Sequence, residues 1–185
     1  MPNRFQPLGD DDWPEAAADL RDGFAGRLNV YRTMAHHPDL LAAWAPLRGH
    51  VVQSSVLTPE QSEIVILRTG HHLGAEYEWA HHVVRGRKAG LSDDRIAAQR
   101  GPIDRMQGDD ALLAGAVDEL FARRRMAPET IAAVHDRLGP QAVLDVMATV
   151  GFYNVLGFIV NSFDTPLDDD VAAELARNPA PAVPA

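Results

Sequence analysis

Acidic and basic side chains recur at helical spacing in one short stretch of the sequence. Glu78 and His82 lie four positions apart, so their side chains share one face if the stretch is helical. Arg85 lies three positions further on and joins that face. Glu63 precedes Gly74, and it faces the Glu78–His82 pair if the two segments pack as antiparallel helices across that glycine.

Two carboxylates and an imidazole in a partly apolar cleft are the groups that proton-transfer chemistry needs. Burial raises the pKa of a carboxyl group, and a like-charged neighbour separates the pKa values of a carboxylate pair. Histidine titrates near neutral pH, so it can donate or accept a proton. The spacing predicts an acid–base site, although a Glu and a His four apart on an exposed helix also form incidental polar pairs.

The segments that carry these residues have clear helical boundaries. The run Thr58–Gln61 is a capping box with proline at the first helical position, and its helix is predicted to end at Gly74. The next helix is predicted over 75–89, because Gly90 is suited to a left-handed C-cap. Further helices are predicted at about 23–35, from 38 through 47, and over 92–99, 109–125, 128–138 and 140–163.

The pattern as a whole predicts an all-α single domain of about seven to eight helices. No run of alternating β-branched residues bounded by turn residues indicates a strand. The helical domain is expected over residues 23–177. Residues 1–22 are predicted to form an N-terminal arm, and residues 178–185 a disordered, proline-rich tail.

The composition excludes several classes of function. The 185 residues include 17 Lys+Arg and 26 Asp+Glu, and the formal net charge of 17 − 26 = −9 argues against a nucleic-acid partner. The absence of cysteine excludes disulfides, thiolate nucleophiles, Cys-ligated zinc and dithiol redox cycles. The apolar run Val146–Val160 is too short for a bilayer, so no membrane partner is expected. The N-terminus shows no secretory pattern, which predicts a cytoplasmic protein.

The spacing of the acid–base residues resembles that of the alkylhydroperoxidase D / carboxymuconolactone decarboxylase superfamily. The redox branch carries a glutamate, eleven residues, a cysteine, two residues, a second cysteine, three residues and a histidine. Here Glu63, Ala75, Glu78 and His82 reproduce that spacing, with both cysteine positions replaced. The phrase from Glu76 to His82 is typical of the non-redox branch. With a second likeness from Phe152 to Leu167, the resemblance covers roughly residues 38–170.

The resemblance implies an alkylhydroperoxidase D-like helical bundle and a choice between two chemistries. Peroxide reduction in the redox branch needs two thiols, so a chain without cysteine cannot be a dithiol peroxidase. The decarboxylase branch removes carbon dioxide from a carboxylated lactone, stabilises the resulting oxyanion and delivers a proton to carbon. The resemblance therefore implies a lyase or isomerase without metal or organic cofactor, acting on a small carboxylated lactone or related organic acid.

Matching positions in the superfamily pattern imply three catalytic residues. His82 is the expected proton donor or oxyanion stabiliser. Glu63 orients it, balances its charge or acts as the acid itself, and Glu78 is a second acid or base. Arg85 is expected to bind a substrate carboxylate through its planar guanidinium group. The other substrate-binding candidates are His71, Tyr77, His81, Asn154 and Asn161.

Structural roles stay open for several of these candidates. Tyr77 is also suited to core or interface packing, and an asparagine on an apolar helix can bond to neighbouring backbone instead of substrate oxygens. The helix at 140–163 has hydrophobic residues on nearly all sides, so it is expected in the core or at a subunit interface. The habit of the superfamily implies a homo-oligomer, a trimer or hexamer.

Two other functions are compatible with the same residues. Three adjacent histidine pairs, at 36–37, 71–72 and 81–82, together with Glu63 and Glu78 are compatible with a metal-dependent His/Glu site, whose ligands would be Glu63, Glu78, His82 and His71. Adjacent residues on a helix diverge by about 100°, so only one member of each pair can ligate a shared ion. The second alternative is a non-catalytic oligomeric binding module on the same fold.

Overall fold

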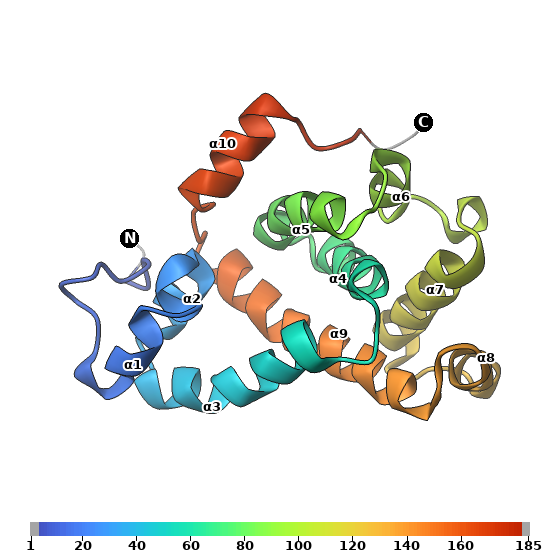
Figure 1. Ribbon diagram of the computed structural model, residues 1–185, viewed down its shortest axis with the longest axis horizontal. Helices are drawn as coiled ribbons and strands as arrows, with labels where there is room; N and C mark the ends of the chain where they lie inside the picture. The colour runs from blue at the N-terminus through green and yellow to red at the C-terminus, as the bar shows by residue number, and fades with distance from the viewer. Residues whose placement is uncertain (1–3, 183–185) are drawn as a thin grey trace.

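The structure is a computed structural model that describes residues 4–182, and over these residues the chain is helical without any strand (Figure 1). This confirms the predicted all-α class. The α-helices are α1 (Ala18–Arg21), α2 (Asn29–Met34), α3 (Pro38–Gly49), α4 (Pro59–Leu73), α5 (Glu76–Ala89), α6 (Asp93–Ala98), α7 (Gly108–Arg123), α8 (Pro128–Leu138), α9 (Pro140–Ser162) and α10 (Asp169–Arg177). Short 3-10 turns and one π-helical turn, η3 (His50–Ser54), connect several of them.

The predicted boundaries of α4 and α5 are confirmed. Thr58 Oγ1 accepts a 3.2 Å hydrogen bond from the Gln61 backbone N–H, and Gln61 Oε1 accepts a 3.0 Å bond from the Thr58 N–H, which completes the capping box. Gly74 ends α4 with a φ of 58°, in the left-handed region that favours glycine. Gly90 ends α5 in the same region. These two glycines fix the lengths of the helices that carry Glu63 and His82.

The N-terminal prediction was wrong in detail. The continuous helix predicted at about 23–35 is instead a 3-10 turn, Ala25–Arg27, followed by extended Leu28 and then α2. Gly26 explains the break, because a Cβ there would lie 2.0 Å from the Arg21 carbonyl oxygen, a distance at which the backbone leaves no room for a side chain. Part of the predicted arm also joins the core, since Ala17 is fully buried.

The C-terminal segment contains a helix that the sequence pattern did not predict. Helix α10 follows the long core helix and packs against α5. Beyond it, the carbonyl oxygens of Asn178 and Pro179 accept hydrogen bonds from Arg87. The predicted disordered tail therefore begins with residues that are tied to α5, while its last three residues, like residues 1–3, lie outside the described part of the chain.

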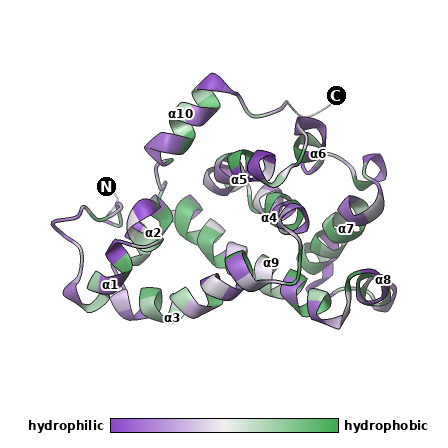
Figure 2. Cartoon of the chain, viewed as in Figure 1, coloured by the Kyte–Doolittle hydropathy of each residue, from purple (hydrophilic) through white to green (hydrophobic). Residues whose placement is uncertain are grey.

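Helices α4 and α9 form the centre of the domain. Helix α4 packs against α5, α7 and α9 (Figure 1). Figure 2 shows how hydrophobic the C-terminal half of α9 is. Helix α9 is long and apolar enough to cross a membrane by length and composition alone, and half of its most apolar 18-residue window is buried in the protein. Its contacts with α4 and α8 give that apolar surface a place in the core.

Two apolar clusters meet along α4 and α5. One cluster gathers residues of α4, α5, α7, α8 and α9, with Leu67 and Val83 fully buried. The other joins α2 and α3 to the C-terminal half of α9, where Trp44 stacks on Phe152 at 4.6 Å between ring centroids. The acid–base residues lie between these clusters, because α4 and α5 contribute side chains to both.

A close helix approach fixes the corner between α4 and α5. A Cβ at Gly157 of α9 would lie 2.6 Å from Leu73 Cδ1 and 3.6 Å from the Ala75 Cβ. Glycine lets α9 pass close to the turn at Gly74 with Leu73 in its present position, and a larger residue would require the Leu73 side chain to move. Ala75 therefore packs against α9. In the redox branch, the matching position is a cysteine.

Candidate active site

Glu63, Glu78 and His82 converge, as the predicted antiparallel packing of α4 and α5 requires. His82 Nδ1 lies 2.7 Å from Glu63 Oε2, and His82 Nε2 lies 3.7 Å from Glu78 Oε2. Arg85 Nη1 lies 3.5 Å from the same Nε2 atom. A carboxylate only accepts hydrogen bonds, so neutral His82 carries its proton on Nδ1 and directs the Nε2 lone pair toward Glu78 and Arg85.

Burial sets the protonation of His82. The residue is 1% exposed, and desolvation lowers its pKa from the usual value. The charge and hydrogen bond of Glu63 act in the opposite direction but do not outweigh burial, and Arg85 lowers the pKa further. His82 is therefore a neutral imidazole near pH 7, able to accept a proton at Nε2.

Glu78 is a carboxyl group that titrates near neutral pH. The residue is 4% exposed, and its burial raises its pKa to about 7, with Asp168 and Glu63 adding to the rise while Arg85 opposes it. Its Oε1 atom is buried without a hydrogen-bond partner among the described residues. Glu78 is thus positioned behind His82 as a group that can both hold and release a proton near neutrality.

A cavity of about 530 Å³ opens beside His82. Its size is in the range of small-molecule sites. Glu63 and His82 contribute to its wall, and Tyr153 of α9 packs edge-on against the His82 ring at 5.0 Å between centroids. Glu78 lies outside this wall and instead lines a separate void of about 10 Å³. His82, whose Nε2 atom lies 3.7 Å from Glu78 Oε2, connects Glu78 with the cavity wall, and Arg85 and Tyr153 line both spaces.

The π-helical turn η3 forms one wall of the cavity and is held by Asp145 of α9. His50 Nε2 lies 2.7 Å from Asp145 Oδ1, while the Ser55 hydroxyl and the Val56 N–H each donate to Asp145 Oδ2 at 2.8 Å. π-Helical turns occur often at functional sites because they displace side chains from regular helical positions. Here the turn places three consecutive residues, 51–53, on the cavity wall.

Tyr77 and His81 lie together in a buried network away from the cavity wall. The Tyr77 hydroxyl donates to Asp168 Oδ2 and accepts from the Val30 N–H, and His81 Nε2 lies 2.9 Å from the same Asp168 oxygen. Asp168 also accepts from the Asn29 N–H at 2.9 Å. The structure therefore gives Tyr77 and His81 partners that join α2 and α5 to the start of α10.

Three further substrate-binding candidates are not brought to the cavity. The Asn154 side chain donates to the Val150 carbonyl one turn earlier in α9, at 2.7 Å. The exposed Asn161 donates to the Leu73 carbonyl at 2.9 Å, so both amides bond to backbone, the alternative left open by the sequence. His71 is exposed near the end of α4 and does not line the cavity. Of the predicted substrate-binding residues, Arg85 lies on the cavity wall.

Sequence reasoning missed three residues of the site and its surroundings. Arg48 and Tyr153 line the cavity, and Asp168 anchors the network behind it. Arg48 and Tyr153 reach the site from α3 and α9, at sequence separations that no helical periodicity connects to His82. Asp168 precedes α10, and a helix prediction there would have drawn attention to it as an N-terminal residue.

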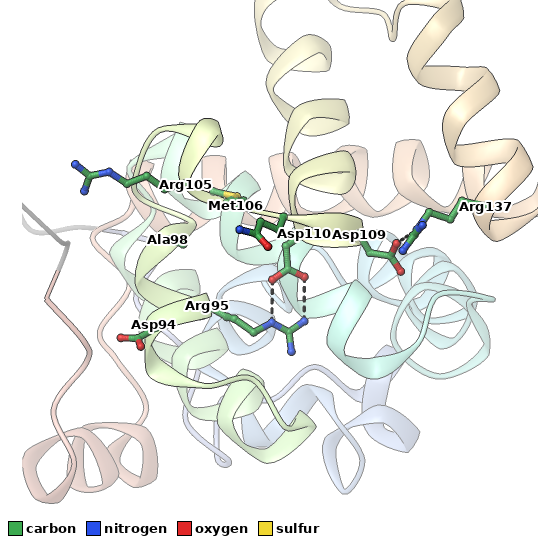
Figure 3. Close-up of a pocket in the computed structure, with 9 residues that line it drawn as sticks. Asp94, Arg95, Ala98, Arg105, Met106, Asp109, Asp110 and Arg137 are labelled. Carbon is green, nitrogen blue, oxygen red and sulfur yellow. Dashed lines mark hydrogen bonds and ion pairs between the residues drawn. The ribbon is translucent and has the colours of Figure 1, made fainter.

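A second cavity, of about 540 Å³, has two ion pairs among the residues that line it (Figure 3). Arg95 donates two hydrogen bonds to Asp110, at 2.8 and 2.9 Å, and Arg137 is paired with Asp109. These ion pairs connect α6, α7 and α8 at the protein surface. Because each of these charged groups already has a partner, they do not form a matched set for a ligand or a reaction.

The described residues contain no group of three or more His, Asp or Glu side chains arranged to hold a metal ion. Glu63 and Glu78 contact opposite nitrogens of His82, so that ring separates the two carboxylates. The histidine pairs at 36–37 and 71–72 do not contribute to the cavity wall. In the described part of the chain, these side chains thus do not assemble the ligand set that the metal-site alternative requires.

Comparison with known proteins gives a family-model match over part of the chain and establishes the fold. Residues 38–117 match the model of the Carboxymuconolactone decarboxylase family. The structure is similar to that of the debrominase Bmp8, with a TM-score of 0.74 and 14% identity over 95% of this chain and 98% of that chain. A structure of a Bmp8 variant in complex with 2,3,4-tribromopyrrole gives a TM-score of 0.71 and 16% identity, over 96% of this chain and 98% of that chain.

A third structure supports the same fold. The alkylhydroperoxidase D core of an uncharacterized peroxidase-related protein from Ralstonia eutropha gives a TM-score of 0.72 and 15% identity, over 90% of this chain and 94% of that chain. At such identities the likeness establishes the fold and leaves the chemistry to the residues of the site. No curated protein sequence matches the chain.

Proposed function

We propose that this chain, a member of the carboxymuconolactone decarboxylase / alkylhydroperoxidase D-like superfamily, is a cofactor-independent lyase or isomerase acting on a small carboxylated lactone or related organic acid. The observation that carries the proposal is the buried Glu63–His82–Glu78 array beside a cavity of about 530 Å³. The absence of cysteine from the whole sequence is the reason for proposing proton transfer instead of dithiol peroxide reduction.

The proposed reaction uses the substrate as its own electron sink. The bond to the departing carboxylate breaks, carbon dioxide leaves, and the electron pair delocalises into the lactone carbonyl to form a dienolate. Arg85, beside His82 Nε2, stabilises the negative charge that develops on oxygen. His82 then delivers a proton to carbon, while Glu63 holds the opposite side of the imidazole ring.

Glu78 supplies the proton that His82 delivers. With a pKa of about 7, it is partly protonated near neutral pH, and its Oε2 atom lies 3.7 Å from the acceptor nitrogen of His82. Proton transfer from Glu78 to His82 Nε2 leaves a buried carboxylate next to the imidazolium and Arg85. The same three residues can move a proton between two carbons of one substrate, which is the isomerase form of the proposal.

The test is turnover of carboxylated lactones and related acids in deuterated water. We expect carbon dioxide release, or a shifted double bond, together with one deuterium on the product carbon, followed by mass spectrometry. His82→Ala and Glu63→Ala should each reduce kcat by about 10²–10⁴-fold, because both remove part of the proton-transfer machinery. The matched control is Glu76→Ala on α5, whose side chain is 73% exposed and lies outside the cavity wall.

Undiminished activity in both His82→Ala and Glu63→Ala contradicts the assignment of the site. Binding of these acids without any turnover favours instead the non-catalytic binding module on the same fold. Turnover that is lost on chelation and restored by a divalent ion favours the metal-dependent alternative. Each of these outcomes is separated from misfolding by the circular dichroism spectrum and thermal midpoint of the variants.

We also propose that the protein works as a cytoplasmic homo-oligomer, a trimer or hexamer. Exposed apolar residues on α9 support self-association, because a monomer leaves Leu144 68% and Phe158 59% exposed. A cysteine-free chain needs no oxidising compartment to fold. Cell fractionation tests the location, and the oligomeric state is tested by solution mass.

A further inference from the structure

Arg48 is a cavity-lining cation that forms no ion pair with any of residues 4–182. It projects from the end of α3, and no acidic side chain of the described residues forms an ion pair with it. Its Nε atom is buried and has no hydrogen-bond partner within residues 4–182. Several other arginines are matched by carboxylates, as Arg68 is by two bonds to Asp118. A buried guanidinium N–H without an acceptor is costly unless a ligand supplies one.

The side chain of Arg48 is held in place by aromatic rings. Its Cζ atom lies 4.2 Å from the centroid of the Phe24 ring and 5.8 Å from that of Tyr31. The Tyr31 side chain also shares a hydrogen bond with Arg48, but neither this bond nor the cation–π contacts give the guanidinium group a carboxylate partner, and its Nε–H stays without an acceptor. Arg48 is thus pre-positioned at the cavity, and positioning that precedes binding reduces the entropy lost when a ligand arrives.

The charges around the cavity leave an excess of positive charge. Arg48 and Arg85 contribute two guanidinium groups to the wall, and Glu63 contributes one carboxylate. Glu63 is already bonded to His82, and Arg85 lies beside His82 with Glu63 and Glu78 near it. Arg48 is therefore the cation on the cavity wall whose positive charge is least balanced by nearby carboxylates. A bound anion would balance this charge.

From this geometry we infer that Arg48 binds a carboxylate of the substrate, with the apolar body of the ligand lying against the wall formed by η3. Val51, Val52 and Ile66 line the same cavity and provide the apolar surface. A planar guanidinium group matches a carboxylate with two parallel hydrogen bonds. Arg48 would thus hold the substrate of the proposed function, and the reaction of that substrate rests on the proposed function. Carboxylate binding at Arg48 does not, because it can be measured without turnover.

The carboxylate at Arg48 is one that the substrate keeps throughout the reaction. A guanidinium group stabilises a carboxylate but not the neutral carbon dioxide formed from it, so it would oppose loss of the group that it holds. A group that stays charged is bound equally in the ground state and the transition state. Changes at Arg48 should therefore raise KM with little change in kcat, whereas changes at His82 lower kcat.

The test is calorimetric titration of the protein with benzoate and with neutral benzamide at constant ionic strength. Benzoate should bind the wild-type protein at least tenfold more tightly than benzamide does. Arg48→Met should lose this preference, and Arg48→Lys, which keeps the charge but not the planar pair of donors, should retain part of it. Arg27→Met provides the control, because Arg27 is exposed in the turn before α2 and lies outside the cavity wall.

The inference is overturned if Arg48→Met, folded by circular dichroism, binds benzoate as tightly as the wild type. It is also overturned if inorganic phosphate displaces benzoate at equal concentration, since the site would then select phosphate-like anions. If Arg48→Met does not fold, Arg48→Lys decides: unchanged benzoate affinity contradicts the inference, and a weakened affinity supports it. Benzoate binding that depends on Arg48 without turnover of any lactone or acid contradicts the proposed function alone.

Discussion

Glu78 is the residue whose environment differs most from that of an ordinary glutamate. Its position in the sequence matches a cysteine of the redox branch, and in the folded chain it is buried between His82 and a small void. A thiol in that position exchanges electrons, whereas a carboxyl group with a pKa of about 7 exchanges protons. A carboxyl group at this position therefore agrees with the proposed proton transfer.

The raised pKa of Glu78 predicts a pH dependence of stability. The folded-state pKa of about 7 is above the usual value of 4.5, so between these values the folded protein holds a proton that the unfolded chain releases. Stability from this group is complete below about pH 4.5 and is lost as the pH rises through 7. The loss is on the order of 3 kcal/mol, at 1.36 kcal/mol per pKa unit.

Glu78→Gln tests this dependence, because an amide stays neutral throughout the range. We expect the variant to lose less unfolding free energy than the wild type when the pH is raised from 4.5 to 8, measured by urea denaturation. Glu76→Gln, on the exposed side of the same helix, should follow the wild-type curve. Parallel curves for Glu78→Gln and the wild type would show that Glu78 ionises as an exposed carboxyl group does.

At the scale of elements, the turn η3 depends on one carboxylate from a distant helix. Asp145 accepts hydrogen bonds from the Ser55 hydroxyl and the Val56 N–H, which follow η3. It also pairs with His50 at the start of the turn. Burial raises the pKa of Asp145, but the hydrogen bonds from His50, Val56 and Ser55 outweigh it and lower the pKa below the usual 3.8. The ionised form is therefore the one that holds the cavity wall in place.

We expect Asp145→Ala to destabilise the fold by about 1–3 kcal/mol, because it leaves the donors of the turn without an acceptor. The wild-type advantage should be present above pH 4 and disappear as the pH falls through the lowered pKa of Asp145. Thermal unfolding at several pH values measures both effects. The matched control is Asp136→Ala on α8, whose side chain is 80% exposed. An equal loss for the two variants contradicts the role of Asp145.

The elements also show which parts of the fold the sequence could predict. Helices α4, α5 and α8 have strong local start and stop residues, such as the capping box at Thr58 and the left-handed Gly74, and their bounds were predicted closely. The break at Gly26 was missed because it depends on a contact with the Arg21 carbonyl. Helix α10 was missed because it is short, and its packing on α5 is a tertiary contact.

The residues of the candidate site also fall into those that the sequence could predict and those that it could not. Glu63, Glu78 and His82 lie on two helices joined by a tight turn, so helical spacing was sufficient to bring them together. Arg48 and Tyr153 come from α3 and α9, and no local pattern places those helices around His82. The pKa values of Glu78 and His82 depend on burial by the whole domain, which spacing alone does not predict.

At the scale of the whole molecule, α9 faces both the core and the solvent. Its buried side carries Phe152, Tyr153 and Leu156, whereas its other side leaves Leu144, Val155 and Phe158 exposed. These three exposed residues are 11 and 3 positions apart, a spacing close to whole helical turns, so they lie along one stripe. Gly151 is exposed within the same stretch, and a Cβ added there would meet no atom within 4 Å. The stripe is thus apolar and open along its length.

Self-association through this stripe is the last prediction. Burying large apolar side chains of neighbouring copies against one another removes them from water, and each contributes about 1.5–3 kcal/mol when fully buried. We therefore expect the wild-type protein to have the mass of a trimer or hexamer by light scattering, and a Leu144→Glu/Phe158→Glu variant to be a monomer, because each copy would place charge in the interface.

Ile131→Glu controls for the loss of an exposed apolar residue elsewhere, since Ile131 lies on α8 and is 37% exposed. A wild-type monomer, or a double variant with the wild-type mass, contradicts the prediction. Retained turnover in a monomeric variant would further show that the acid–base site is complete within one chain.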